Sequence, residues 1–203
     1  MWRGSALVLA AVALASTAAA GRSDAAVSQS VRNLVQERLA GVSTSPTSSN
    51  AVRTTRAGLA MVALENAVVD RMNDVRHARG LRPLRASGRL QAAALFHSRD
   101  MGRRGYFEHD SISGTPFWRR IERFYPSRGF RSWTVGENLL WGSGTYDANF
   151  AVREWMASPP HRHNILSRSW REVGIGAVYF VHAPGEYGGR PVTIVTVDFG
   201  SRT

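Results

Sequence analysis

The chain contains no cysteine, and this absence constrains its fold more than any other feature of the sequence. Disulfide bonds and thiolate-bound zinc, which stabilise many small exported domains, are both excluded. The fold must therefore be held by an apolar core alone. Of the 203 residues, 43% are hydrophobic and 9% are aromatic, which is enough for one ordinary domain and excludes a chain that is disordered throughout.

The first residues have the pattern of a secretory signal peptide. Arg3 gives a positive start, residues 6–15 form an apolar run, and three alanines at 18–20 precede Gly21. The apolar run is shorter than the roughly 20 residues that a helix needs to cross a bilayer, and no later segment is long enough. We therefore predict a signal peptide over residues 1–22 and a secreted mature protein, either extracellular or periplasmic.

The segment 23–55 separates the predicted signal peptide from the body of the chain. Residues 41–55 are rich in Ser and Thr and predict a linker, because such a composition cannot bury enough apolar surface to order itself. Residues 56–203 hold every organised motif and are predicted to be the folded domain. Before the linker, apolar residues at helical spacing predict a short amphipathic helix: Val27, Val31, Leu34, Val35 and Leu39.

The body of the chain predicts several helices followed by a β-hairpin. Two β-rich runs, residues 173–181 and 192–199, are joined by a turn-forming segment and predict antiparallel strands. Apolar periodicity, capping residues and proline positions define the helices. The predicted helices are one that ends at Gly80, one from Ser87 to Gly105, one over residues 116–124, one from Asp147 to Ser158, and one more short turn with Ser158 as its cap and Pro159 as its first residue.

Three ionisable residues stand in segments that otherwise look half buried: His109, Glu137 and His161. The signatures of zinc peptidases, redox proteins, nucleotide-binding proteins and serine hydrolases are absent from the sequence. Two imidazoles and a carboxylate that meet in a cleft can bind a divalent cation or carry out acid–base catalysis. The same residues can also serve the fold alone, the histidines by bonding loop carbonyls and Glu137 by capping backbone amides.

Five blocks of the body carry a family resemblance, in this order: residues 94–101 (ALFHSRDM), 105–109 (GYFEH), 136–138 (GEN), 155–166 (WMASPPHRHNIL) and 172–176 (EVGIG). Together they resemble the CAP superfamily of cysteine-rich secretory proteins, antigen 5 and pathogenesis-related protein 1, in its cysteine-free bacterial form. The resemblance implies an α+β fold, a three-layer α-β-α sandwich with a small antiparallel sheet. It also implies a third strand within residues 131–140 and a fourth near His109.

The resemblance also implies a site, because the family's cleft holds two histidines and two acids that bind zinc or another divalent cation in several members. Carried over to this sequence, the histidines fall on His109 and His161, and one acid falls on Glu137. The second acid of many eukaryotic members falls on Ser158 and does not transfer. Glu154 lies four residues earlier on the same helix face, and we predict that it takes the place of this second acid. The alternative interpretation is that Glu154 is a solvated helix residue with no role in the site. The predicted metal ligands are therefore these two histidines and two glutamates, and no catalytic residue is predicted.

The charge of the chain is strongly positive, with 26 arginines, no lysine and a formal net charge of +11. Nucleic-acid binding requires a basic stripe with interleaved aromatic residues, and only residues 118–124 resemble one. Helical spacing there places Arg119, Arg120 and Arg123 on one face, as on any half-solvated helix. We therefore predict a monomer with no nucleic-acid partner. Anionic cell-envelope polymers or lipid headgroups fit the charge, and sterols or fatty acids are ligands that the resemblance implies.

Three functions stay open at this point. The first is a secreted CAP-type binding or interaction module whose cleft holds a divalent cation such as zinc. The second is a secreted peptidase-like hydrolase that uses the same cleft, ranked lower because no nucleophile is evident and a fold does not carry activity with it. The third is a basic envelope- or lipid-binding protein with a vestigial cleft. The sequence leaves open whether the chain is an enzyme.

Overall fold

The computed structural model describes the secondary structure of residues 46–203 and the side chains of residues 57–203. Asn50–Thr203 form one unit, which holds the elements below apart from the first residues of the first helix. The predicted signal peptide and the predicted amphipathic segment lie outside the described residues.

Strands and helices alternate irregularly along the described chain. The four strands form one sheet in the order β1-β3-β4-β2, in which β1 runs parallel to β3 and the other neighbours are antiparallel. The elements, in chain order, are α2 (Pro46–His77), β1 (Arg85–Ala86), α3 (Gly88–Arg104), α4 (Phe117–Glu122), β2 (Trp133–Ser143), α5 (Ala148–Ala157), α6 (Pro159–Leu166), β3 (Glu172–Phe180), the 3-10 helix η1 (Gly185–Tyr187) and β4 (Val192–Arg202).

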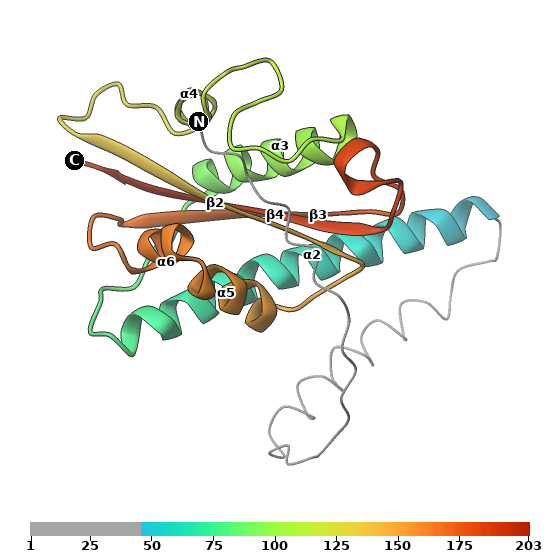
Figure 1. Ribbon diagram of the computed structural model, residues 1–203, viewed down its shortest axis with the longest axis horizontal. Coiled ribbons are helices and arrows are strands. Elements are labelled where there is room, and N and C mark those ends of the chain that lie inside the picture. Colours follow the sequence, from blue (N-terminus) through green and yellow to red (C-terminus); the bar gives the residue numbers. More distant parts are fainter. Residues whose placement is uncertain (1–45) are drawn as a thin grey trace, which may run out of the picture. The chain divides into compact units, whose positions relative to one another are not determined.

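Helices cover both faces of the sheet, with α3 and α4 on one side and α2, α5 and α6 on the other (Figure 1). Successive side chains of a strand point to opposite faces, so β4 contributes to both layers. Val195, Val197 and Phe199 belong to the core under α2, α5 and α6. Val192 and Ile194 belong to a second core on the opposite face. The arrangement confirms the predicted three-layer α-β-α sandwich.

Helix α3 lies unusually close to β3 because two glycines of the strand face it. A Cβ atom on Gly174 would lie 2.0 Å from the backbone nitrogen of Gln91, and one on Gly176 would lie 2.2 Å from that of Leu95. Real Cβ atoms do not approach this closely, so any side chain would push α3 off the sheet. The position of α3 in turn sets the position of the loop that follows it.

The ends of the helices follow the local signals in the sequence. Gly80, three residues after the last residue of α2, adopts the left-handed conformation with φ of 63°. Gly105 adopts the same conformation with φ of 72° and is the C-cap of α3. The side chain of Asp147 accepts a hydrogen bond of 2.8 Å from the backbone nitrogen of Phe150 and caps α5. Pro159 opens α6, which has eight residues.

Two predictions about secondary structure are wrong. Residues 46–55, predicted as a linker, are helical and form the start of α2, because a helix that is already nucleated extends through Ser and Thr at little cost. The fourth strand is β1, not a segment near His109, which lies in the loop between α3 and α4. A strand of two exposed residues has no periodicity to detect. The strand that the resemblance implies within residues 131–140 is confirmed and is β2.

Candidate functional site

The candidate site is built on β2, which is an edge strand of the sheet. Glu137 and Asn138 lie in the middle of this strand, and because they are consecutive their side chains point to opposite faces. Glu137 faces the layer of α3 and α4, where it meets Arg120 of α4. Asn138 faces α6, where its amide nitrogen donates to the backbone oxygen of His161 at 3.0 Å. One short segment therefore links the two helical layers.

The Glu137 carboxylate is the centre of a buried ionic network. Its side chain is 0% exposed, and its Oε1 lies 2.8 Å from Nδ1 of His109. Its Oε2 accepts a hydrogen bond from Nη2 of Arg120, a side chain that is only 1% exposed. Arg120 also donates through Nη1 to the backbone oxygen of His109, at 2.8 Å. One guanidinium thus holds both the carboxylate and the loop that carries the histidine.

His109 is the part of this network that reaches solvent, with 51% of its side chain exposed. An ionised Glu137 only accepts hydrogen bonds, so the proton of the neutral ring is assigned to Nδ1. Its Nε2 has no partner among the described residues. Partial burial and the charge of Arg120 lower the pKa of His109 from its ordinary value. The network therefore presents a neutral imidazole with a free Nε2 lone pair.

Asp198 is a second buried acid, and it lies directly opposite Glu137 in the register of β2 and β4. Burial and the neighbouring Glu137 raise the pKa of Asp198 well above its ordinary value. Neither of its oxygens has a hydrogen-bond donor among the described residues. Burial also raises the pKa of Glu137, to about 7, while the charge of Arg120 lowers it. Because Arg120 contacts Glu137 and so favours its ionised form, we assign the proton of this pair to Asp198.

His161 comes to β2 from the opposite layer, on α6. Asn164 of the same helix donates through Nδ2 to the Glu137 backbone oxygen at 3.0 Å and to Oδ1 of Asn138 at 2.8 Å. These bonds fix α6 against the strand. Burial and the charge of His109 lower the pKa of His161, so the two imidazoles lie within electrostatic reach of each other. Both rings are neutral near pH 7.

Glu154, the proposed substitute for the family's second acid, is not tied to this network. It lies on α5, and its closest charged contact is Nε of Arg153 at 3.7 Å. No hydrogen bond or ion pair joins it to His109, Glu137 or His161 in the described part of the chain. The structure therefore joins His109 and Glu137 directly, brings the His161 imidazole within electrostatic reach of His109, and leaves Glu154 aside.

The residues that are present do not fit a metal ion in this arrangement. Among the described residues, no group of three or more His, Asp or Glu side chains is placed to hold one. Both oxygens of Glu137 are already engaged, and the adjacent Arg120 charge repels a dication. Metal ligation by His109, Glu137, His161 and Glu154 is therefore a prediction from the sequence that this geometry does not support, and a zinc titration is its test.

Sequence reasoning missed two members of the network, Arg120 and Asp198. Arg120 was predicted on a solvated helix face, which is wrong, since α4 buries it together with Ile121. On this short helix the solvated side includes Trp118, which is exposed. A signal for Asp198 was available, because it is the only acid in the apolar run that forms β4.

The comparisons identify the family. Residues 69–199 match the family model described as the cysteine-rich secretory protein family, CAP, and this match covers more than half of the chain. The chain belongs to the CAP family. The CAP domain is also 36% identical over 126 residues to the uncharacterised protein YkwD of Bacillus subtilis strain 168, a match that covers 62% of this chain and 46% of YkwD. The chain thus matches less than half the length of that relative.

Solved structures show the same fold. An extracellular protein of Bacillus anthracis that contains an SCP domain superposes with a TM-score of 0.53 at 25% identity, covering 68% of this chain and 40% of that one. An outer surface protein of Borrelia burgdorferi superposes with a TM-score of 0.52 at 21% identity, covering 66% of this chain and 90% of that one. Within the described part of this CAP chain, no helix has the length and apolarity to cross a membrane.

Proposed function

We propose that this chain is an exported CAP-domain binding module that contacts its ligand through the exposed imidazole of His109, beside His161. Export is supported by the signal-peptide pattern of residues 1–22 and by the extracellular and outer-surface descriptions of two structural relatives. The relatives lend support only to the location, and the binding role rests on the site itself.

One observation carries the binding role, namely that Arg120 and Glu137 hold His109 in one orientation with Nε2 facing solvent. A group that is fixed before a ligand arrives loses little conformational entropy on binding. Neither His109 nor His161 has a side-chain hydrogen bond to a hydroxyl group among the described residues. The site therefore offers a positioned hydrogen-bonding surface without a nucleophile.

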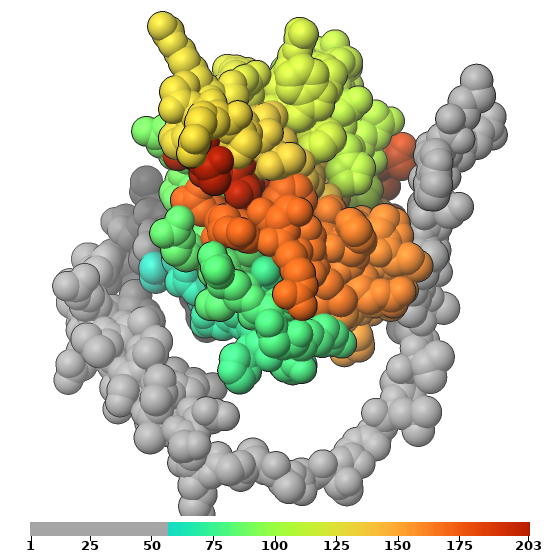
Figure 2. Space-filling view, turned by 90° about the vertical axis from the view of Figure 1, so that its left-hand side faces the viewer, coloured from blue at the N-terminus to red at the C-terminus, as the bar shows by residue number. Residues whose placement is uncertain are grey.

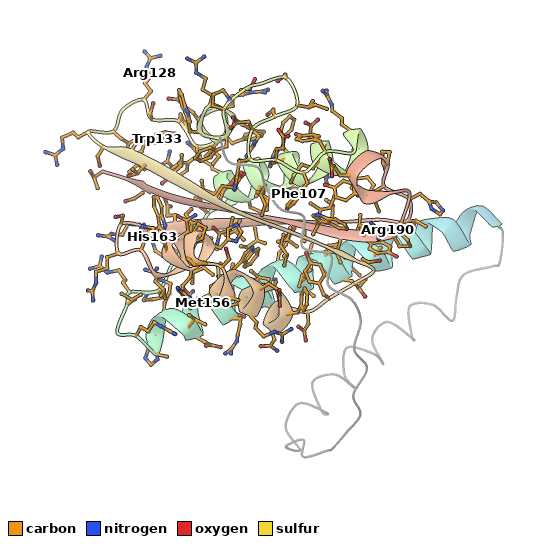
Figure 3. All side chains as sticks on the ribbon, viewed as in Figure 1. Phe107, Arg128, Trp133, Met156, His163 and Arg190 are labelled. Carbon is orange, nitrogen blue, oxygen red and sulfur yellow. The ribbon has the colours of Figure 1, made fainter. Side chains whose placement is uncertain are left out.

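Co-sedimentation with isolated bacterial cell envelopes tests this role at fixed ionic strength. We expect the purified protein to be retained and His109→Ala to reduce the retained fraction about tenfold, since a preorganised polar contact is worth about 1.4 kcal/mol. Arg128→Gln is the control, because Arg128 extends from the loop between α4 and β2 (Figure 3). An equal loss in both variants would instead favour a basic envelope-binding protein with a vestigial cleft.

A secreted hydrolase is the second candidate, and the contact between His109 and Glu137 favours it specifically. A carboxylate that orients the Nδ1 of an imidazole leaves Nε2 free to act as a general base towards water. Incubation with a peptide library, followed by mass spectrometry, tests this candidate. Cleavage that is present in the wild type and lost in His109→Ala would replace the binding role, whereas the binding module gives no cleavage that depends on His109.

The divalent cation predicted for this site is tested by calorimetric titration with zinc. Zinc requires neutral imidazoles, which the lowered pKa values of His109 and His161 supply, but it also requires Glu137 to leave Arg120. We therefore expect no tight zinc binding by the wild type. Tight binding that both His109→Ala and Glu137→Gln abolish would restore the metal site to the proposal.

The export part of the proposal has its own test. Intact-mass analysis of exported protein should find a chain that begins between about Gly21 and Val27, because the small residues before Gly21 fit a cleavage site. Exported protein that still contains residues 1–20 would contradict the signal peptide.

A further inference from the structure

A pocket of about 350 Å³ opens where the C-terminal end of α2 meets the segment between α6 and β3. Figure 2 faces this end of the molecule, with the α2 end in green and the α6–β3 segment in orange. The pocket lies in the layer of α2 and α6, away from the face on which Glu137 meets Arg120. Its lining residues are Arg76, Gly80, Leu81, Arg82, Arg168 and Arg171.

Arg76 is the buried member of this lining, with only 1% of its surface exposed. Its Nε donates to the backbone oxygen of Arg82 at 2.9 Å. Its Nη1 donates to the backbone oxygens of Ile165 and Ser167, at 2.6 and 2.9 Å. These bonds hold the guanidinium rigidly between α2 and α6.

The remaining nitrogen of Arg76, Nη2, has no acceptor among the described residues. It retains some access to solvent, because it is absent from the fully buried side-chain atoms that have no hydrogen-bond partner. Two N–H donors of a fixed guanidinium, on a residue that lines the pocket, are therefore left without an acceptor among the described residues. The backbone nitrogens of Gly80 and Leu81 are already bonded to His77 and Arg76 oxygens. Any ligand in the pocket would thus be held by arginine side chains.

The pocket carries positive charge that the protein does not balance. None of its lining residues is acidic, and none of its four arginines forms an ion pair with a carboxylate in the described part of the chain. Burial and the charge of Arg171 lower the pKa of Arg76, which is the expected effect of like charges held close together. A bound anion would relieve both the repulsion and the empty donors.

We propose that this arginine pocket binds an oxyanion of the phosphate type. The two N–H groups of Arg76 Nη2 can donate to phosphate oxygens, and the other arginines around the cavity can bind the remaining oxygens through the parallel N–H groups of their guanidinium groups. The pocket lies apart from His109 and is independent of the proposed binding role there. The phosphate is either a free ion or ester, or the headgroup of an anionic lipid.

Titration of the full chain with inorganic phosphate, followed by amide NMR shifts at constant ionic strength, tests the proposal. Arg82→Gln and Arg168→Gln each remove a guanidinium that makes no side-chain hydrogen bond among the described residues, so the fold is preserved. We expect saturable shifts around Gly80 and Arg171 in the wild type and about tenfold weaker binding in each variant. Arg128→Gln, which changes the net charge equally but lies outside the pocket, should bind like the wild type.

Two results would overturn the proposal: an absence of saturable shifts in the wild type, or binding that Arg128→Gln weakens as much as Arg82→Gln does. A second arm distinguishes the two sources of phosphate. Sedimentation with vesicles of phosphatidylglycerol and phosphatidylcholine, again comparing Arg82→Gln with Arg128→Gln, reports on the lipid headgroup. Vesicle binding that depends on Arg82 assigns the pocket to lipid, whereas phosphate binding without it assigns the pocket to a free ion or ester.

Discussion

Two arginines of this domain are equally buried but have opposite surroundings. Arg120 and Arg76 are each 1% exposed, and each bonds to backbone oxygens. Arg120 also meets the Glu137 carboxylate, so its charge is balanced within the protein. Arg76 meets only neutral oxygens and lies near the positive charge of Arg171.

The different surroundings of the two arginines imply different needs for a ligand. A buried charge without a partner is unfavourable, and a protein that keeps one needs either solvent or a ligand beside it. At β2 the Arg120 charge is balanced by the Glu137 carboxylate, and the His109 imidazole is the member of the network that reaches solvent. At the end of α2 the guanidinium itself is the unsatisfied group. The charge of Arg120 is therefore balanced without a ligand, whereas the charge of Arg76 is the one that the proposed anion would balance.

The largest expected effect is the loss of stability in Arg120→Met. This change leaves Glu137 and Asp198 buried without a cation, and breaking a buried ion pair from one side costs roughly 3–5 kcal/mol. Urea unfolding measures the loss, and Arg119→Met at the exposed neighbouring position is the control, expected within about 0.5 kcal/mol of the wild type. A loss for Arg120→Met no larger than the control's would show that the ion pair is not formed.

A smaller loss is expected for Arg76→Met. The change leaves backbone oxygens without their donor, at a cost of about 1–3 kcal/mol, but no opposite charge is left behind. Urea unfolding in phosphate-free buffer measures it, with Arg79→Met, an exposed residue just beyond α2, as the control. A larger loss of unfolding free energy for Arg76→Met than for Arg120→Met would contradict the claim that only Arg120 is paired with a buried opposite charge.

The smallest effect is a change in the pH dependence of stability in Asp198→Asn. Folding raises the pKa of Asp198, so above the unfolded-state pKa of about 3.9 the folded chain binds more protons than the unfolded chain. This contribution is fully present below that pKa and is lost as pH rises through the folded-state pKa. From about pH 5 to about pH 8, the free energy of unfolding of the wild type should therefore fall relative to Asp198→Asn.

The control for this effect is Asp70→Asn, the same chemical change at an exposed position of α2. Its unfolding free energy should run parallel to that of the wild type across the pH range. If Asp198→Asn also runs parallel, Asp198 is ionised in the folded state and the proton assignment at Glu137 is wrong.

Sequence reasoning reached the parts of the fold whose signals are local. The cap at Asp147, the stop at Gly105 and the hairpin of β3 and β4 each depend on a few consecutive residues. The motif resemblance added β2 and placed His109 and Glu137 in one site, where they make a direct hydrogen bond. These features could be predicted from the sequence because each depends on a short motif.

The buried charges could not be predicted from the sequence in the same way. Arg120 looks solvated in sequence because its partner, Glu137, is 17 residues away and on another element. Arg76 bonds to the backbone oxygens of Ile165 and Ser167, about 90 residues later, and backbone oxygens leave no trace in a sequence. Burial of a charge is thus a tertiary property, which depends on which segments the fold brings together.

NMR of the arginine side chains during a phosphate titration tests the contrast between the two regions most directly. The Nε–H resonances of Arg76 and Arg120 can be assigned by their loss in Arg76→Lys and Arg120→Lys. We predict a saturable shift of the Arg76 resonance and no shift of the Arg120 resonance, because Arg76 lines the arginine pocket without a carboxylate partner, whereas Arg120 is paired with Glu137. An unmoved Arg76 resonance, or equal shifts of both, would contradict it.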